Sequence, residues 1–200
     1  MEAARGQYDV DARLEADVNA GSIMVGFEDT YAYRGTFDGN GHTLTFNVYD
    51  HGRKYVGPFV NVGNATIMNL HTAGTITSSQ MYATGLVAQV LNGTATIENC
   101  QSSVTVKGTM DGEGTLAGFV GRVSNSNVTI RNSKFDGRFE GDNCYGNAGF
   151  ISWVDGVSSA TIDNCLFNPD RISTKTDNNE TWARKDASGS VTVTNSHAVI

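Results

Sequence analysis

The chain has 200 residues, which allows one ordinary domain or one compact solenoid, and 39% of them are hydrophobic while 18% are charged. This composition excludes a disordered chain and predicts a real apolar core. The formal net charge of −7, with no run of basic residues, disfavours nucleic acid or an anionic membrane surface as a partner. No stretch approaches the roughly 18 to 20 apolar residues of a membrane span, so we expect no membrane insertion.

Residues 1–32 are expected to form an N-terminal cap with the first strands. The segment 8–21 places Val10, Leu14 and Val18 at helical spacing, whereas Leu14, Ala16 and Val18 alternate as in a strand, so both types stay open. Either type would cover the first coil of a solenoid. The opening MEAARGQYDV has neither the basic start nor the apolar middle of a signal peptide, so we expect a cytosolic protein or one whose leader was removed.

The stretch YRGTFDGNGHTLTFNV (33–48) contains the turn signal DGNG between two alternating runs. In the second run, Leu44, Phe46 and Val48 are predicted to face the interior. Some pectin hydrolases carry a Gly-His-Gly motif near such a position, but Thr43 follows His42 here, so we interpret His42 as a turn residue.

One motif then recurs along the chain. The copies are ATIMNL (65–70), ATIENC (95–100), VTIRNS (128–133), ATIDNC (160–165) and VTVTNS (191–196), and their starts are 30, 33, 32 and 31 residues apart. Such a period is typical of a stacked solenoid, and each unit contains three short strand patterns without helical spacing. We predict an all-β, right-handed parallel β-helix of about five coils, forming one domain over residues 1–200 with regular coils in 33–165 and an irregular last coil and terminal strand in 166–200.

Strand alternation assigns a face to each position of the motif. The third position is predicted to face the interior, in the column Ile67, Ile97, Ile130, Ile162 and Val193. The fourth position varies freely and is predicted to face outward, in the column Met68, Glu98, Arg131, Asp163 and Thr194. The fifth position predicts a structural ladder of side-chain amides at the bend, formed by Asn69, Asn99, Asn132, Asn164 and Asn195.

The third strand of each unit opens with a glycine, at Gly57, Gly85, Gly118 and Gly149. Alternation predicts inward columns of Leu86, Phe119 and Phe150, of Ala88, Gly121 and Ser152, and of Val90, Val123 and Val154. It places Val87, Val120 and Ile151 outside, where an apolar column is either covered or a contact surface.

The last unit departs from this pattern. Trp182 takes the Leu/Phe position, and Arg184 falls in the inward column of Ser152. Because an unpaired cation cannot stay in an apolar interior, we expect the helix to loosen here. Residues 169–179 should be the least regular stretch, and a final strand in 190–200 should end the sheet.

Neither cysteine nor histidine chemistry is indicated. Cys100, Cys144 and Cys165 are an odd number without C-x-x-C spacing, and Cys100 and Cys165 hold the same slot two coils apart, roughly 9 to 10 Å, too far for a disulfide. We predict buried free thiols. The four histidines are His42, His51, His71 and His197. They do not recur at the spacing of metal ligands, so we expect no metal and no cofactor.

Glycoside hydrolysis needs two carboxylates about 5 to 10 Å apart, and the candidate pairs are unconvincing. Glu98 and Asp163 lie two coils apart with Arg131 between them, which favours a surface charge ladder. Asp111 and Glu113 lie in the loop MDGEG, where a turn is favoured over a weak cation site.

A third acidic group surrounds FDGRFEGDN, with Asp136, Glu140 and Asp142. Arg138 is the only nearby candidate for the base of a lyase, and it alternates with apolar neighbours as a surface residue would. We therefore expect no enzyme, with a β-helix polysaccharide lyase or hydrolase as the alternative.

Binding is the favoured class of function. Tyr82, Tyr145 and Trp153 precede or lie within the glycine-opened strands, and Arg122 lies outward on one of them, so we predict these four as ligand-binding residues at one edge. The ligand would be a polysaccharide or a host or partner protein, and the module is expected to be a monomer. A rigid spacer without a ligand is the alternative. The mixed outward column excludes an ice binder.

The G-[LF]-[VI]-[GA] strands at Gly85, Gly118 and Gly149, interleaved with T-I-x-N-C and preceded by GTFDGNGHTL, resemble GLUG-type β-helix modules of bacterial secreted and surface proteins. These include adhesin-like and IgA-protease-like polypeptides. The resemblance runs from about Leu14 to the end and implies an extracellular or cell-surface location within a larger parent, whose signal and anchor would lie outside these 200 residues. It carries no catalytic motif.

Overall fold

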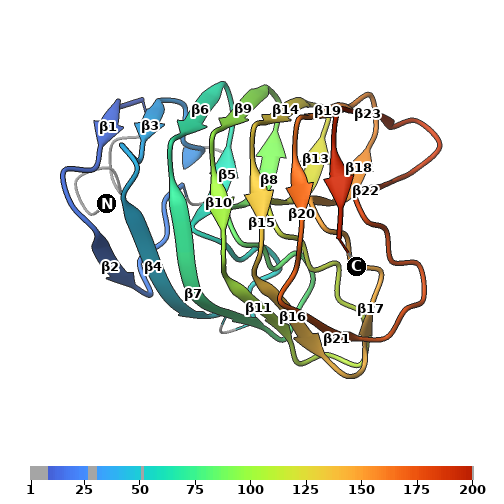
Figure 1. Ribbon diagram of the computed structural model, residues 1–200. Coiled ribbons are helices and arrows are strands. Elements are labelled where there is room, and N and C mark those ends of the chain that lie inside the picture. The colour runs from blue at the N-terminus through green and yellow to red at the C-terminus, as the bar shows by residue number, and fades with distance from the viewer. Residues whose placement is uncertain (1–8, 27–30, 51, 200) are drawn as a thin grey trace.

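The computed structural model describes residues 9–26, 31–50 and 52–199, and in this part of the chain every strand pairing is parallel and no α-helix occurs. Three sheets run along a solenoid whose coils lie side by side from the N-terminal to the C-terminal end (Figure 1). The described residues contain no helix of the length and hydrophobicity that a membrane span requires. The predicted all-β parallel solenoid with three short strands per coil is confirmed.

Sheet A contains the recurring motif. Its strands, in spatial order, are β1 (Ala12–Arg13), β3 (Thr36–Asp38), β6 (Ala65–Met68), β9 (Thr94–Glu98), β14 (Asn127–Arg131), β19 (Ser159–Asp163) and β23 (Ser190–Thr194). The third motif positions pair in register from Ile67 through Ile97, Ile130 and Ile162 to Val193. The repeat read from the sequence is therefore the coil repeat of the structure.

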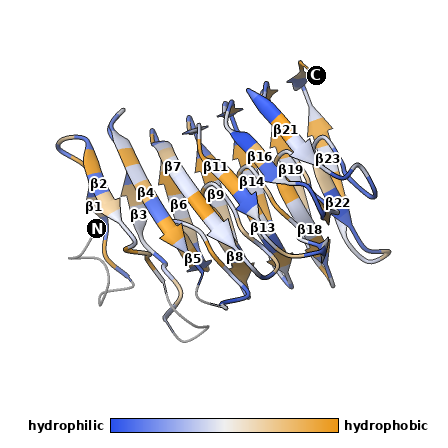
Figure 2. Cartoon of the chain, turned by 90° about the horizontal axis from the view of Figure 1, so that it is seen from below, coloured by the Kyte–Doolittle hydropathy of each residue, from blue (hydrophilic) through white to orange (hydrophobic). Residues whose placement is uncertain are grey.

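Sheet B follows the asparagine bend. Its path is β21 (Arg171–Thr174), β16 (Arg138–Gly141), β11 (Thr105–Gly108), β7 (His71–Ser78), β10 (Gln101–Ser102), β15 (Lys134–Phe135), β20 (Leu166–Phe167) and β24 (His197–Ala198). In addition, β4 (Thr43–Tyr49) pairs with β7, and β2 (Val18–Gly21) pairs with β4. Seen from below, strands of this sheet such as β4 carry hydrophobic and hydrophilic bands in turn (Figure 2).

Sheet C contains the glycine-opened strands. They are β5 (Phe59–Val62), β8 (Val87–Leu91), β13 (Val120–Ser124), β18 (Ile151–Asp155) and β22 (Ala183–Lys185). Between sheets B and C the chain crosses in the segments 79–83, 109–116, 142–147 and 175–179, which differ in length although the positions on either side stay in register. Two of these crossing segments pair through β12 (Gly112–Glu113) and β17 (Cys144–Tyr145).

The N-terminal segment forms a further parallel rung instead of a helix. From Ala12 onward it is extended, with β1 paired to β3 and β2 paired to β4. A bend at Glu15 separates the two strands, so Leu14 is buried while Ala16 is exposed and the predicted alternation is interrupted. Residues 1–8 lie outside the described residues.

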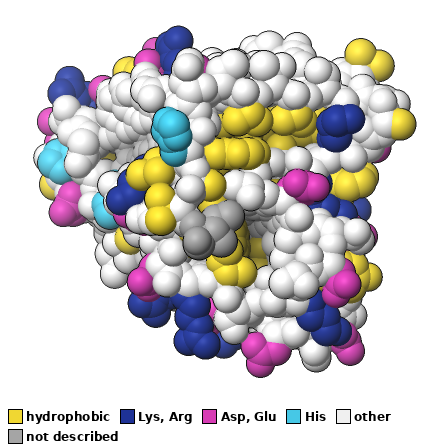
Figure 3. Space-filling view, turned by 45° about the vertical axis from the view of Figure 1, so that its right-hand side comes forward, with side chains coloured by type: hydrophobic (Ala, Val, Ile, Leu, Met, Phe, Trp, Pro, Cys, Tyr) yellow, Lys and Arg dark blue, Asp and Glu magenta, His cyan; other side chains and the backbone are white. Residues whose placement is uncertain are grey.

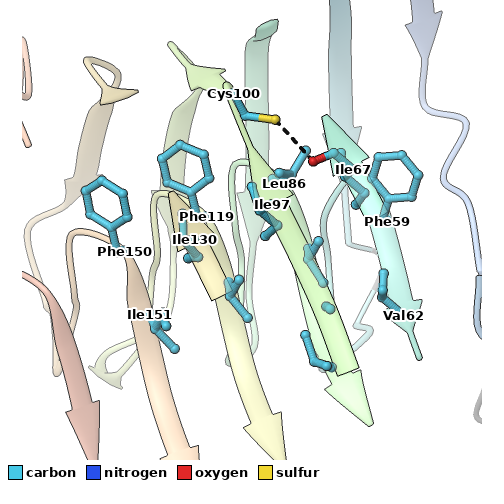
Figure 4. Packing of buried hydrophobic residues seen from close by; sticks show 14 of the residues in the cluster. Phe59, Val62, Ile67, Leu86, Ile97, Cys100, Phe119, Ile130, Phe150 and Ile151 are labelled. Carbon is cyan, nitrogen blue, oxygen red and sulfur yellow. Dashed lines mark hydrogen bonds between the residues drawn. The ribbon is translucent and has the colours of Figure 1, made fainter. Parts of the chain in front are cut away.

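The interior is filled by stacked columns of apolar side chains. Figure 4 shows Ile67, Ile97 and Ile130 of sheet A in one row along the solenoid, with a second row beside it that is formed by Phe59, Leu86, Phe119 and Phe150. The rings of Phe119 and Phe150 stack with centroids 4.9 Å apart. Similar side chains recur at one coil spacing along each column. Each coil therefore packs closely against its neighbours, and these local contacts build the core.

The predicted outward column of sheet C is wrong. Val87, Val120 and Ile151 have no exposed surface and belong to the core. The residue that follows each of them packs against a crossing segment. Ser152 donates a hydrogen bond to the Thr115 carbonyl (2.7 Å), and a Cβ at Gly121 would lie 3.1 Å from Cβ of Tyr82. Simple alternation therefore fails at the start of these strands.

The buried cysteines take part in the bend. The Cys100 thiol donates to the carbonyls of Glu98 at 3.2 Å and of Ile67 at 3.6 Å (Figure 4). Burial raises the pKa of Cys100 to about 12 and that of Cys165 to about 11. All three cysteines are free and buried, as predicted.

The asparagine column is only partly a hydrogen-bonded ladder. Asn99 donates to Asn69 at 3.2 Å and Asn164 donates to Asn132 at 2.8 Å, whereas Asn195 donates to the Asp163 carboxylate. Four of the five side chains are exposed, so they do not satisfy a buried turn. What all five share is a left-handed backbone with φ from 50° to 53°, a conformation that asparagine tolerates better than other non-glycine residues.

The C-terminal coil exposes apolar side chains. The predicted irregular stretch 169–179 includes β21, and the final segment splits into β23 and β24 in two different sheets. On this end, which is turned forward in Figure 3, hydrophobic side chains gather around a hollow. Ile172, Val193 and Val199 are 45%, 38% and 58% exposed, although Val193 belongs to the inward column.

Candidate functional site

Non-repeating side chains from five coils converge outside sheet C, between its strands and the crossing segments. We call this site the corner and define it by Tyr55, Tyr82, Arg122, Trp153 and Arg184. Arg122 and Trp153 lie in register on β13 and β18. The corner therefore unites three of the four residues predicted to bind a ligand.

The two tyrosines form a stack at one side of the corner. Their rings are 5.2 Å apart and inclined by 11°, with the Lys54 ammonium 5.5 Å from the Tyr82 ring. Tyr82 has a left-handed backbone (φ 59°), and its N–H donates to the Thr115 hydroxyl at 3.0 Å. Burial raises the pKa of Tyr82 to about 12, so the ring stays a neutral phenol at physiological pH.

Arg122 connects the tyrosines to a carboxylate. Its Nε and Nη2 donate to one oxygen of Asp155 at 2.8 and 2.6 Å, and its Nη1 donates to the Tyr55 hydroxyl at 2.9 Å. Burial alone would lower the pKa of Arg122, but these hydrogen bonds hold it above its usual value. Among the described residues, none donates a hydrogen bond to Oδ1 of Asp155, which is buried.

Arg184 corrects the expectation of a loosened last coil. Its side chain is only 8% exposed, yet it is paired: Nη2 contacts Glu113 at 2.5 Å, and Nη1 donates to the Gly146 carbonyl at 2.5 Å. Its guanidinium carbon also lies 4.9 Å from the Trp153 ring centroid. The strand β22 continues sheet C beside β18, with a register shift between Ile151 and Val154.

Tyr145 lies at the edge of the corner. It pairs in register with Glu113 through β17 and β12, and Glu113 binds Arg184. Sequence reasoning missed Tyr55 and treated Arg184 only as a misfit. No sequence signal marks Tyr55: its likeness to Tyr82 rests on the bridge that the two following residues, Val56 and Ala83, form between neighbouring coils.

The acidic candidates are distributed over the solenoid, and Glu98, Asp163 and Asp111 each have a partner. Glu98 pairs with Arg131 at 2.7 Å, and Asp163 accepts from Thr194 at 2.6 Å, which fits a surface ladder. Asp111 lies 3.6 Å from Lys175. Asp136 belongs to the outer face of sheet B, away from the corner, as do Arg138 and Glu140.

No three His, Cys, Asp or Glu side chains gather as metal ligands in residues 9–26, 31–50 and 52–199. His42 lies 3.4 Å from Asp17, and His197 lies in β24. His71 forms hydrogen bonds on sheet B with Thr43 and Ser103. His51 lies outside the described residues.

These features define a parallel β-solenoid with three sheets and a non-repeating corner. The chain is similar to a solved structure of a "putative immunoglobulin A1 protease" from Bacteroides ovatus, with a TM-score of 0.62 and 18% identity, over 98% of this chain and 70% of that one. At this identity the similarity shows the fold alone. No protein-family model and no curated protein sequence matches the chain, so of the GLUG resemblance only the β-solenoid fold is supported.

Proposed function

We propose that this chain is a non-catalytic recognition module that binds a protein partner through the corner, within a larger secreted or surface-anchored bacterial protein. The observation that carries the proposal is the convergence of two tyrosines, a tryptophan and two arginines from separate coils on one site. Tyr, Trp and Arg are the residue types that dominate the energetics of protein interfaces.

The corner is also pre-organised. Arg122 is fixed by Asp155 and Tyr55, and Arg184 is fixed by Glu113 and the Trp153 ring. Side chains that are already ordered lose little rotamer freedom when a partner binds, which favours affinity.

The first probe is immunoglobulin A, because the similar structure is described as an immunoglobulin A1 protease. We would immobilise it beside a panel of purified extracellular host proteins and measure binding of the chain by surface plasmon resonance. The Trp153→Ala substitution should weaken binding to the recognised protein by about thirtyfold, as expected for an interface hot spot worth roughly 2 kcal/mol. Lys54→Ala should weaken it less, because this lysine is exposed.

Tyr49→Ala is the matched control, since Tyr49 is 51% exposed on β4, a strand of sheet B, whereas the corner lies outside sheet C. It should bind as the unchanged chain does, and thermal denaturation should show that all variants are folded. Equal binding of the Trp153→Ala variant would refute the corner as the site.

A rigid spacer is the second candidate, favoured by the partners that the described carboxylates and arginines already have within the chain. If no panel member binds, and an unrelated β-helix replaces the module without loss of the parent protein's function, the spacer role stands. An assay for new reducing ends or unsaturated products from acidic and neutral polysaccharides tests the lyase or hydrolase alternative.

A further inference from the structure

The outer face of sheet B carries two polar hollows. The first, of about 640 Å³, is lined by residues that include Ser103, Thr105, Asp136, Arg138, Asn168 and Asp170. The second, of about 410 Å³, is lined by residues that include Lys107, Met110, Glu140, Asp142, Arg171 and Ser173. We call the two hollows together the sheet B groove.

The two hollows follow one another along the strands. Thr105 and Lys107 are alternate residues of β11, so their side chains lie on the same face. Arg138 of the first hollow pairs in register with Arg171 of the second. The sheet B groove is therefore one elongated surface, and it is formed by a different sheet from the corner.

Charge is balanced in this groove. Its lining contains four cationic residues, Lys107, Lys134, Arg138 and Arg171, and four anionic ones, Asp136, Glu140, Asp142 and Asp170. Two of the cations are neutralised in place, because Lys134 lies 2.8 Å from Asp136 and Arg138 lies 2.5 Å from Asp170. A polyanion would find no net positive field here.

The polar groups of the first hollow are held in position. Asp136 accepts hydrogen bonds from Ser103 at 2.5 Å and from Gln101 at 2.7 Å, in addition to Lys134. Since Ser103 donates its proton to Asp136, its oxygen accepts from Nε2 of His71 at 2.8 Å. Burial alone would raise the pKa of Asp136, but its hydrogen bonds lower the pKa, so the carboxylate is ionised at neutral pH.

We infer that the sheet B groove binds an uncharged oligosaccharide laid along the strands. Fixed carboxylates and amide oxygens accept from sugar hydroxyls, while lysine, arginine and amide groups donate to them. The lining offers few apolar side chains, which disfavours a protein hot spot at this face. Its elongated form suits a chain of several sugar units instead of a single sugar.

The test is titration calorimetry of the whole chain with linear pentasaccharides of glucose, xylose and mannose, and with polygalacturonate as the anionic probe. At least one neutral pentasaccharide should bind at millimolar concentration or below. Asp136→Asn and Arg138→Ala should each weaken that binding by about tenfold or more, as expected for loss of a hydrogen bond to a charged group. Amide resonances of residues 101–107 and 134–141 should shift on binding.

Arg131→Ala is the matched control, because Arg131 is an exposed arginine on sheet A with one carboxylate partner, Glu98. It should leave sugar binding unchanged, and so should Trp153→Ala in the corner, so the two proposed sites fail or succeed independently. Binding of polygalacturonate alone, no binding by any neutral pentasaccharide, or resonance shifts confined to the corner would each overturn the inference.

Discussion

Replacing Asn99 by glycine or by alanine separates the two roles that an asparagine column can have. Asn99 is exposed, donates to the Asn69 amide at 3.2 Å and has a φ of 53°. Both substitutions remove the amide hydrogen bond. Only alanine also places a Cβ on a left-handed backbone, because glycine adopts that conformation freely.

The expected magnitudes follow from these two contributions. An exposed hydrogen bond between two side-chain amides contributes at most about 1 kcal/mol to the free energy of unfolding. The left-handed conformation costs alanine roughly 1 to 2 kcal/mol, whereas glycine costs about 0.5 to 1 kcal/mol through the entropy of the unfolded chain. We therefore expect Asn99→Ala to lose about 2 kcal/mol and Asn99→Gly about 1 kcal/mol.

The free energy of unfolding of both variants is measured by urea denaturation followed by far-UV circular dichroism. Equal slopes of the transitions show that the variants unfold with the same cooperativity. The matched control is Asn47, an exposed asparagine inside β4 that is not left-handed. There the order should reverse, because glycine is about 0.5 to 1 kcal/mol worse than alanine within a strand. An Asn99→Ala variant as stable as Asn99→Gly would refute the backbone explanation and restore the amide ladder.

Three further outcomes are expected. Gly118→Ala should destabilise the chain by about 3 kcal/mol in the same urea assay, because its Cβ would lie 2.2 Å from a carbonyl oxygen of the next coil; no change would contradict the close coil contact. Asp50 is buried, and hydrogen bonds such as that from Ser79 outweigh burial and lower its pKa. The ionised Asp50 carboxylate thus stabilises the fold fully above its unfolded-state pKa of about 4, and this contribution is lost as the pH falls through its lowered folded-state pKa. In the Asp50→Asn variant, the melting temperature should therefore fall less steeply as the pH is lowered. Glu113→Gln should cost about 1 to 3 kcal/mol, since it leaves the buried Arg184 without its anion; an unchanged melting temperature would argue against that ion pair.

The fold could be predicted because its information is local and repeated. Ile97 and its counterparts mark the interior once per coil, and the register follows from that spacing. The facing of Val87 could not be predicted, because the chain departs from simple alternation where it leaves the crossing segment. The partner of Arg184 is 71 residues earlier in the chain, and a one-dimensional pattern holds no signal for such a contact.

The candidate site was predictable only in part for the same reason. Tyr82, Arg122 and Trp153 were predicted from their places before or within the glycine-opened strands. Tyr55 was missed because its likeness to Tyr82 depends on a bridge between coils, from Val56 to Ala83, that becomes visible only in three dimensions. Asp136, Arg138, Glu140 and Asp142 of the sheet B groove stand in one segment of the sequence. The charges that complete the groove, Lys107, Asp170 and Arg171, come from neighbouring coils, and no local pattern connects them to that segment.

The unequal crossing segments have a consequence for how this protein can change. Segments 79–83, 109–116, 142–147 and 175–179 vary in length while the strands on both sides keep their register. Doubling the length of a flexible loop costs only about 0.6 kcal/mol, so insertions here leave the pitch of the coils intact. One of these segments supplies Tyr82 to the corner, and another supplies Glu113, the partner of Arg184. The scaffold can therefore acquire new surface residues by exchange of these segments, one coil at a time.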